Sequence, residues 1–197
     1  QLLLKNVREL LCRNATHSTI NRVKKLFFKW KVHESPVIDK VIAIIFEKAG
    51  KSRSRGVYYS ALCSALVEKE VNEGATVPRF RESILRRAEN TASAMKTDEF
   101  VKTNKAEIEA KTDVKKQEEE GELLEEEVQF RRRIFSNIIF IGHLYIRDVL
   151  PAHIVRLCMS NLLDVSQGPI DEIGEESIDC AIRLLELIGK RIHDEEN

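Results

Sequence analysis

The sequence of 197 residues is poor in the two residues that most often interrupt helices, with only 8 glycines and 4 prolines. Glycine and proline lower helix stability more than any other residues, so their scarcity favours long helices. The chain also lacks a run of about 18 apolar residues, so no membrane-spanning helix is expected. Basic and acidic residues balance at 32 each. Because the formal net charge is zero, no general attraction to nucleic acid is expected.

Motifs that carry out catalysis are missing as well. There is no P-loop, no GxGxxG, no HExxH and no GxSxG, which argues against common nucleotide-dependent, metal-dependent and serine hydrolase chemistry. The five histidines are scattered, and no pair has metal-ligand spacing. The four cysteines lack CxxC spacing and lie in apolar helical contexts, a pattern typical of free thiols in a reducing compartment. We therefore expect a non-enzymatic binding protein with no cofactor, metal or small-molecule substrate.

What the sequence does contain is apolar residues at helical spacing along most of its length. Ser35 and Pro36 are typical of a helix start, Gly50 of a helix end, and Pro78 of another start. No segment shows the alternation of a strand between glycine-bounded turns. The expected helices cover 2–13, 19–31, 36–50, 57–71, 78–95, 130–150, 151–163 and 175–192.

These helices group into four pairs, near 2–31, 35–72, 78–147 and 151–192. The third pair is lengthened by a highly charged insertion at 97–127, which we expect to be partly helical and partly disordered. Without it, the later spacing is about 40 residues, the size of HEAT-type helical hairpins. Each hairpin has an apolar face that only a neighbour can bury. We predict one all-α domain over 1–197, a HEAT-like solenoid of about four stacked antiparallel pairs.

The segment 130–150 is the most informative stretch, because it is apolar on nearly every side and therefore typical of an inner helix. An α-helix turns by about 100° per residue, and at this angle the polar residues of the segment fall on one narrow face, which we call the polar ribbon. Its members are Gln129, Arg132, Arg133, Ser136, His143 and Arg147. Phe140 falls within the same ribbon, so it is either presented among cations or covered by a neighbouring helix.

Two groups of residues are candidates for binding a partner. Arginine is favoured at interfaces because its planar fork pairs with carboxylates and phosphates. The alternative for both groups is that the cations only aid solubility or pair with the acidic insertion. The predicted partner-binding residues are Arg132, Arg133, Phe140, His143 and Arg147. The predicted RNA-binding residues form the basic loop Lys51, Arg53 and Arg55.

Three segments resemble the middle domain of eukaryotic initiation factor 4 gamma. VIDKVIAIIFEKA at 37–49 is similar to its second helical pair, and RRRIFSNIIFIGHL at 131–144 to its arginine-led helix. The closing ESIDCAIRLLELIGKRI at 176–192 resembles its fourth pair. The chain departs from the family pattern at Ser136, Ile139 and His143, where the family usually has glycine, lysine and an acidic residue.

The resemblance implies a cytoplasmic HEAT-repeat scaffold of translation initiation. Such a domain binds a DEAD-box RNA helicase of the initiation factor 4A type, contacts mRNA and other initiation factors, and has no membrane partner. The alternatives are a diverged translation repressor, or an RNA-binding or decay-complex interaction module of the same superfamily. The family domain has five pairs, so the resemblance also implies that loss of the last pair would expose the apolar side of 176–192.

Overall fold

The computed structural model describes residues 2–13, 18–51, 53–94, 113–163 and 175–196. Within these ranges the chain is helical and contains no strand, which confirms the all-α prediction. The α-helices are α1 (Leu2–Arg13), α2 (Ile20–Lys29), α3 (Ile38–Gly50), α4 (Gly56–Asn72), α5 (Arg79–Ser93), α7 (Asp113–Tyr145), α8 (Ala152–Leu162) and α9 (Glu175–Glu196). Two short 3₁₀ helices lie between them, η1 (Val32–Glu34) and η2 (Arg53–Arg55).

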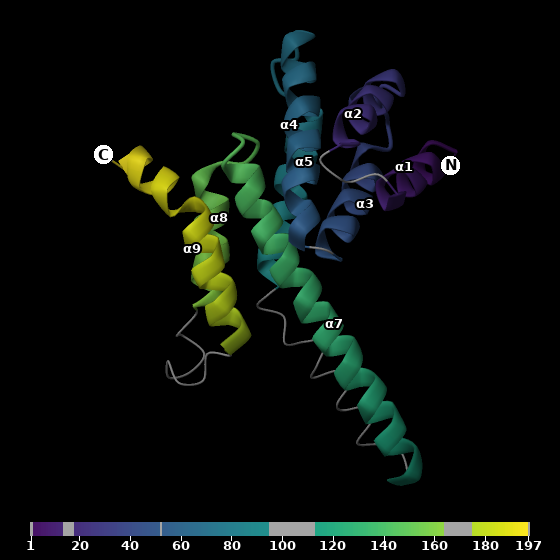
Figure 1. Ribbon diagram of the computed structural model, residues 1–197, viewed down its shortest axis with the longest axis vertical. Helices are drawn as coiled ribbons and strands as arrows, with labels where there is room; N and C mark the ends of the chain where they lie inside the picture. The colour runs from purple at the N-terminus through teal and green to yellow at the C-terminus, as the bar shows by residue number, and fades with distance from the viewer. Residues whose placement is uncertain (1, 14–17, 52, 95–112, 164–174, 197) are drawn as a thin grey trace.

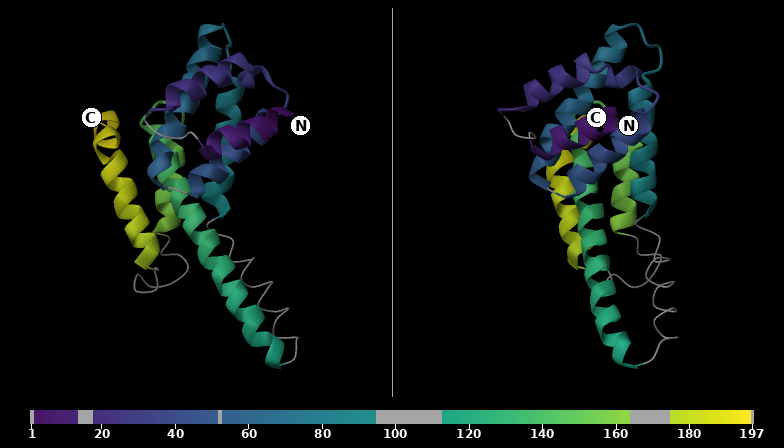
Figure 2. Two further views of the ribbon diagram at one scale, coloured as in Figure 1. Left: turned by 45° about the vertical axis from the view of Figure 1, so that its right-hand side comes forward. Right: turned by 90° about the vertical axis from the view of Figure 1, so that its right-hand side faces the viewer.

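The helices stack across the molecule in chain order, with the two termini on opposite sides (Figure 1). Helix α7 lies at the centre and packs against α3, α4 and α9. Its N-terminal half extends well beyond the other helices in all three views (Figures 1 and 2). The C-terminal half of α7 is thus the structural axis of the domain.

Helix α3 illustrates why the sequence folds in this way. It is apolar on most sides because it packs against α1, α5 and α7 at once. A helix covered by three neighbours has no broad polar face to keep in water. Its buried residues are Ile38, Val41, Ile42, Ile44, Ile45, Phe46, Ala49 and Gly50.

Helices α4 and α7 are each followed by a left-handed residue, and their last carbonyl groups accept hydrogen bonds there. After α4, Gly74 has φ 89°. The N–H of Gly74 donates to the carbonyl of Val71, and the N–H of Ala75 to that of Glu70, both at 3.0 Å. This is a Schellman motif. Asp148, with φ 60°, ends α7 by the same pattern of hydrogen bonds.

Two buried glycines allow helices to approach α7 closely. A Cβ at Gly50 would lie 3.1 Å from Asn137 Nδ2 and 3.3 Å from the carbonyl oxygen of Arg133. A Cβ at Gly142 would lie 2.8 Å from Leu184 Cδ1 on α9. Helix α3 ends at Gly50, which confirms the helix end predicted there. The close packing of α3 on α7 is a further reason for a glycine at this position.

The charged insertion is only partly described. Its residues 97–112 lie outside the described part of the chain, whereas 113–127 form the first turns of α7, and Gly121 lies within that helix. The helix predicted at 130–150 is therefore the C-terminal half of a much longer one, and it ends at Tyr145 rather than at Leu150. The insertion contains no proline to end this helix, so it continues through the charged stretch.

Among the cysteines, Cys63, Cys158 and Cys180 are buried free thiols, as predicted, whereas Cys12 is exposed. Burial raises the pKa of the Cys63 thiol above its ordinary range, and the pKa of Cys158 to about 12. No helix in the described ranges is long and apolar enough to cross a bilayer.

Candidate partner-binding surface

A groove of about 720 Å³ lies where the end of α3 meets the middle of α7. Three of its lining side chains are cations, namely Lys51, Arg132 and Arg133, and all three are exposed. We call it the basic groove. Its other lining residues are Gly50, Gln129, Ser136 and Glu176. The structure thus joins one residue of the predicted RNA-binding loop with two of the predicted partner-binding ribbon.

The cations of the basic groove are only lightly held. Lys51 Nζ donates to Glu47 Oε1 at 3.1 Å, an exposed i,i+4 pair. Arg133 Nε donates to the backbone carbonyl of Gln129 at 3.2 Å. Exposed ion pairs contribute little to stability. A partner carboxylate or phosphate can therefore replace them at small cost.

A second groove, of about 640 Å³, lies beside α1, α3 and α5. It has an apolar floor and a rim of cations around a single carboxylate. The lining residues are Leu4, Lys5, Arg8, Lys40, Ala43, Ile44, Glu47 and Arg87. This groove was not predicted from the sequence, because residues from three separate helices form it.

Glu47 connects the two grooves. It receives a hydrogen bond from Lys51 and another from Arg8 Nη1, the latter at 2.8 Å. Burial by itself would raise the pKa of Glu47, but the hydrogen bond from Lys51 and the charges of Lys48 and Arg8 outweigh it and hold that pKa below its ordinary value. Lys40, Ile44, Glu47 and Lys51 follow helical spacing along one face of α3. These residues of the two grooves therefore lie along one face of α3, which we call the strip.

His143 and Arg147 do not reach the basic groove. Arg147 Nε donates to Ser60 Oγ of α4 at 3.0 Å, and His143 lies against Gly56 at the start of α4. Both side chains are half-buried. They hold α7 against α4, so the structure gives them a packing position rather than a free binding surface.

Phe140 is not on the surface, which corrects its inclusion among the predicted contact residues. It is fully buried, and its ring packs edge-on against Phe46 of α3 with centroids 5.1 Å apart. The ribbon pattern left open whether Phe140 is presented among cations or covered by a neighbouring helix, and in the structure it is covered. Helix α3 covers this side of α7, so Phe140 cannot touch a partner directly.

The remaining residues of the predicted RNA-binding loop are Arg53 and Arg55. Both lie in η2, but the side chain of Arg53 is outside the described part of the structure. Arg55 is exposed, and its guanidinium lies near the Tyr59 hydroxyl, where it partly offsets the rise that burial causes in the pKa of Tyr59. The structure does not bring Arg55 into the basic groove.

Glu176 is a residue of the basic groove that was not predicted from the sequence. Gln129 and Ser136 belonged to the polar ribbon and were found by the period of α7. Glu176 is in the first turn of α9 and reaches the groove only because α9 packs on α7. No pattern within 175–192 indicates that contact.

Replacing His143 by glutamine is expected to flatten the pH dependence of stability. Burial, and next the charge of Arg147, lower the pKa of His143 below its ordinary value of 6.5. As the pH falls below about 6.5, His143 takes up a proton more readily in the unfolded chain than in the folded one. The free energy of unfolding therefore decreases as the pH falls through this range. Urea unfolding between about pH 7.5 and about pH 5.5 should show a smaller loss for His143→Gln than for the wild type. The exposed His153→Gln serves as control, and equal losses in all three proteins would contradict the expectation.

Comparison with known proteins agrees with the resemblance in the sequence. Residues 4–197 match the MIF4G domain family. The chain is 31% identical over 202 residues to mouse eukaryotic translation initiation factor 4 gamma 3, and 32% identical over 199 residues to mouse factor 4 gamma 1. These matches cover 100% and 96% of this chain but 12% of each relative. The chain belongs to the MIF4G domain family.

A solved structure shows the same fold. The crystal structure of the MIF4G domain of Trypanosoma cruzi translation initiation factor EIF4G5 aligns with a TM-score of 0.64 and 19% sequence identity. The alignment covers 96% of this chain and 78% of that one. This likeness confirms the predicted HEAT-like helical solenoid.

Proposed function

We propose that this chain is a non-enzymatic scaffold domain of cytoplasmic translation initiation, and that it binds a DEAD-box RNA helicase of the initiation factor 4A type. The observation that carries the proposal is the basic groove on the axial helix of a MIF4G fold. Membership of the MIF4G family and the two relatives named as translation initiation factors support the setting. The finer claim, the helicase, comes from the sequence resemblance.

The groove has suitable chemistry for a protein partner. Its cations come from two rigid elements, the end of α3 and the middle of α7, which pack against each other through Gly50. A rigid platform loses little conformational freedom when it binds. Glu176 gives the groove a carboxylate beside the arginines, which favours a protein surface of mixed charge over the uniformly negative backbone of RNA.

The strip along α3 extends the same surface. Beyond Glu47 it reaches the apolar floor of the second groove at Ala43 and Ile44. A surface of this length suits a partner that touches the domain at two places. A scaffold that binds one arrangement of two mobile lobes more tightly shifts the helicase toward that arrangement. A preference of about 1.4 kcal/mol is a tenfold shift.

The test is a titration of this chain against the initiation-factor helicase, with both affinity and RNA-stimulated ATPase rate as readouts. We expect saturable binding and faster ATP turnover. Binding without stimulation would leave the scaffold but remove the activating role. Absence of binding by a chain that unfolds cooperatively would reject the helicase as the partner.

A further inference from the structure

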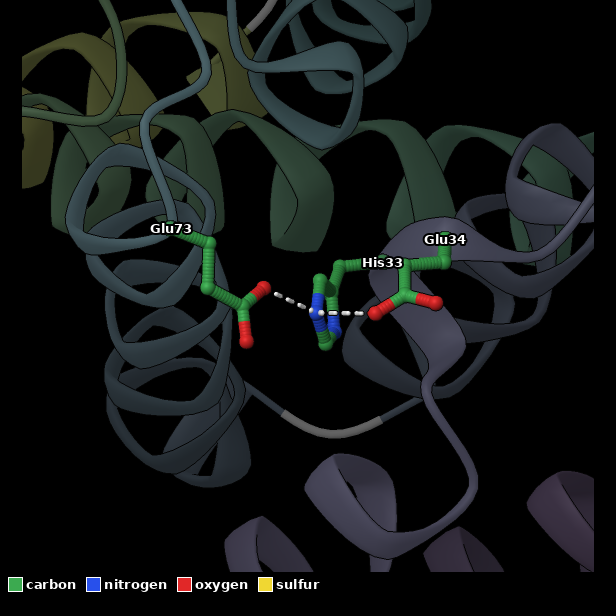
Figure 3. A group of neighbouring side chains, drawn as sticks. All are labelled: His33, Glu34 and Glu73. Atoms are coloured by element: carbon green, nitrogen blue, oxygen red, sulfur yellow. Dashed lines mark hydrogen bonds and ion pairs between the residues drawn. The ribbon is translucent and has the colours of Figure 1, made fainter.

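His33 is a buried histidine at a junction between two parts of the solenoid. It is the middle residue of η1, which follows the left-handed residue Lys31 with φ 48°. Its side chain is only 2% exposed. Figure 3 shows its imidazole between the carboxylates of Glu34, from the same short helix, and Glu73, from the end of α4.

The three side chains converge on one point. His33 Nε2 lies 2.8 Å from Glu73 Oε2 and 3.7 Å from Glu34 Oε1. All three donor atoms lie within 4.8 Å of one another. Tetrahedral zinc with bonds of about 2.0–2.1 Å to nitrogen and oxygen holds its ligand atoms about 3.4 Å apart. The two distances from Nε2 are about 0.6 Å shorter and about 0.3 Å longer than this spacing. The two carboxylate oxygens are within 4.8 Å of each other, so binding the ion would require small movements of the exposed carboxylates.

A hydrogen bond alone explains only part of this arrangement. A neutral imidazole carries at most one hydrogen on Nε2, and a short bond to Glu73 uses it. Glu34 also faces Nε2 but receives no hydrogen bond from it. In the other neutral tautomer the hydrogen is on Nδ1, and a single cation on the Nε2 lone pair would then contact both carboxylates at once.

Two lysines also pair with these carboxylates. Lys31 Nζ lies 3.1 Å from both oxygens of Glu34, and Lys69 pairs with Glu73. Both glutamate side chains are more than 40% exposed, so these pairs are screened by water and weak. An ion bound at His33 would replace these weak pairs on the carboxylate oxygens.

We propose that His33, Glu34 and Glu73 bind one divalent transition metal ion, with zinc the best match. One imidazole nitrogen and two carboxylate oxygens form a ligand set that suits zinc. Mg²⁺ and Ca²⁺ prefer six or more oxygen ligands and fit poorly. Two carboxylates balance the charge of the ion, and exposure on the carboxylate side leaves its fourth position to water.

Such an ion would connect the junction after α2 to the turn between α4 and α5. These segments are 40 residues apart in sequence. Because an ion held by both segments binds only the folded chain, its binding adds to stability. This consequence does not depend on the proposed scaffold function, since neither groove includes the three residues.

The experiment uses the full chain with Cys12→Ser, because Cys12 is an exposed free thiol and thiols are also zinc ligands. After treatment with a chelator, ZnCl₂ is titrated by calorimetry, and thermal unfolding is followed at each concentration. We expect one equivalent to bind and Tm to rise until the site is saturated, with no comparable effect of MgCl₂. Co²⁺ should give the visible absorption of a tetrahedral site.

Glu34→Gln and Glu73→Gln provide the decisive comparison, since each keeps the side-chain shape and removes an anionic ligand. We expect each to weaken zinc binding at least tenfold. Glu68→Gln is the matched control, because Glu68 is on α4 and accepts a hydrogen bond from Ser64 instead. No zinc binding, binding unchanged in both variants, or an equal response to MgCl₂ would overturn the proposal.

Discussion

Replacing Phe140 by alanine is expected to lower the free energy of unfolding by about 3–5 kcal/mol. The ring is fully buried, and removing it leaves a cavity between α7 and α3. Phe140 also packs edge-to-face against Phe46, with an interplanar angle of 77°. Because α7 is the axis on which α3, α4 and α9 pack, little of this cavity can collapse.

Urea unfolding of Phe140→Ala checks this expectation, with Phe130→Ala as the matched control. Phe130 is on the same helix but is 40% exposed, so its removal should cost about 1 kcal/mol or less. A double-mutant cycle with Phe46→Ala should give a coupling of about 0.5–1.5 kcal/mol for the ring pair. Equal losses for Phe130 and Phe140 would show that Phe140 is not covered.

The second large effect concerns the basic groove. Reversing its charge with Lys51→Glu, Arg132→Glu and Arg133→Glu is expected to weaken helicase binding at least tenfold, or by about 1.4 kcal/mol. The introduced glutamates would repel a partner surface that is acidic where it meets the groove. Charges at the rim of an interface also control the rate of association. The fold should survive, since all three side chains are exposed.

Affinity should be measured by calorimetry at low and moderate salt, beside a control with the same change in net charge. Arg22→Glu, Lys25→Glu and Lys190→Glu provide it, because these exposed cations line neither groove. The groove variant should lose affinity while the control keeps it. Equal loss in both would mean that net charge, rather than the groove, attracts the partner. RNA binding that falls steeply with salt and disappears with the groove would instead identify it as an RNA site.

Arg147 is left out of this triple variant for a structural reason. Its Nε donates to the buried Ser60, so a carboxylate at this position would lose that bond and face a buried hydroxyl group. A loss of binding would then be indistinguishable from a loss of packing between α7 and α4. The ribbon predicted from sequence had grouped Arg147 with Arg132 and Arg133, although only the latter two remain at an open surface.

Helical period explains how far the candidate site was predictable. Residues 132, 133 and 136 share a face of one helix, and any α-helix places them together. The period cannot say which neighbouring helix covers a given part of that face. Phe140 and Arg132 are two turns apart on one ribbon, but α3 covers the first and leaves the second exposed. For the same reason Lys51 could not be assigned to the ribbon before α3 was seen to end beside α7.

By itself the sequence determined the properties that depend on neighbours along the chain. These are the helices, the all-α class, and several helix ends such as those at Gly50 and Pro78. The family was also recognisable, from the segments 37–49, 131–144 and 176–192. Helix formation and capping involve residues within about one turn of each other, so local patterns are sufficient.

Tertiary structure alone decided which surfaces stay open and which distant residues meet. It buried Phe140, brought Glu176 and Lys51 to the arginines of α7, and placed Glu73 beside His33. These contacts join residues from separate helices, and they depend on how closely helices approach at positions such as Gly50 and Gly142. The physical reason is that packing selects among many possible neighbours for each apolar face, and the local pattern of a helix does not distinguish between them.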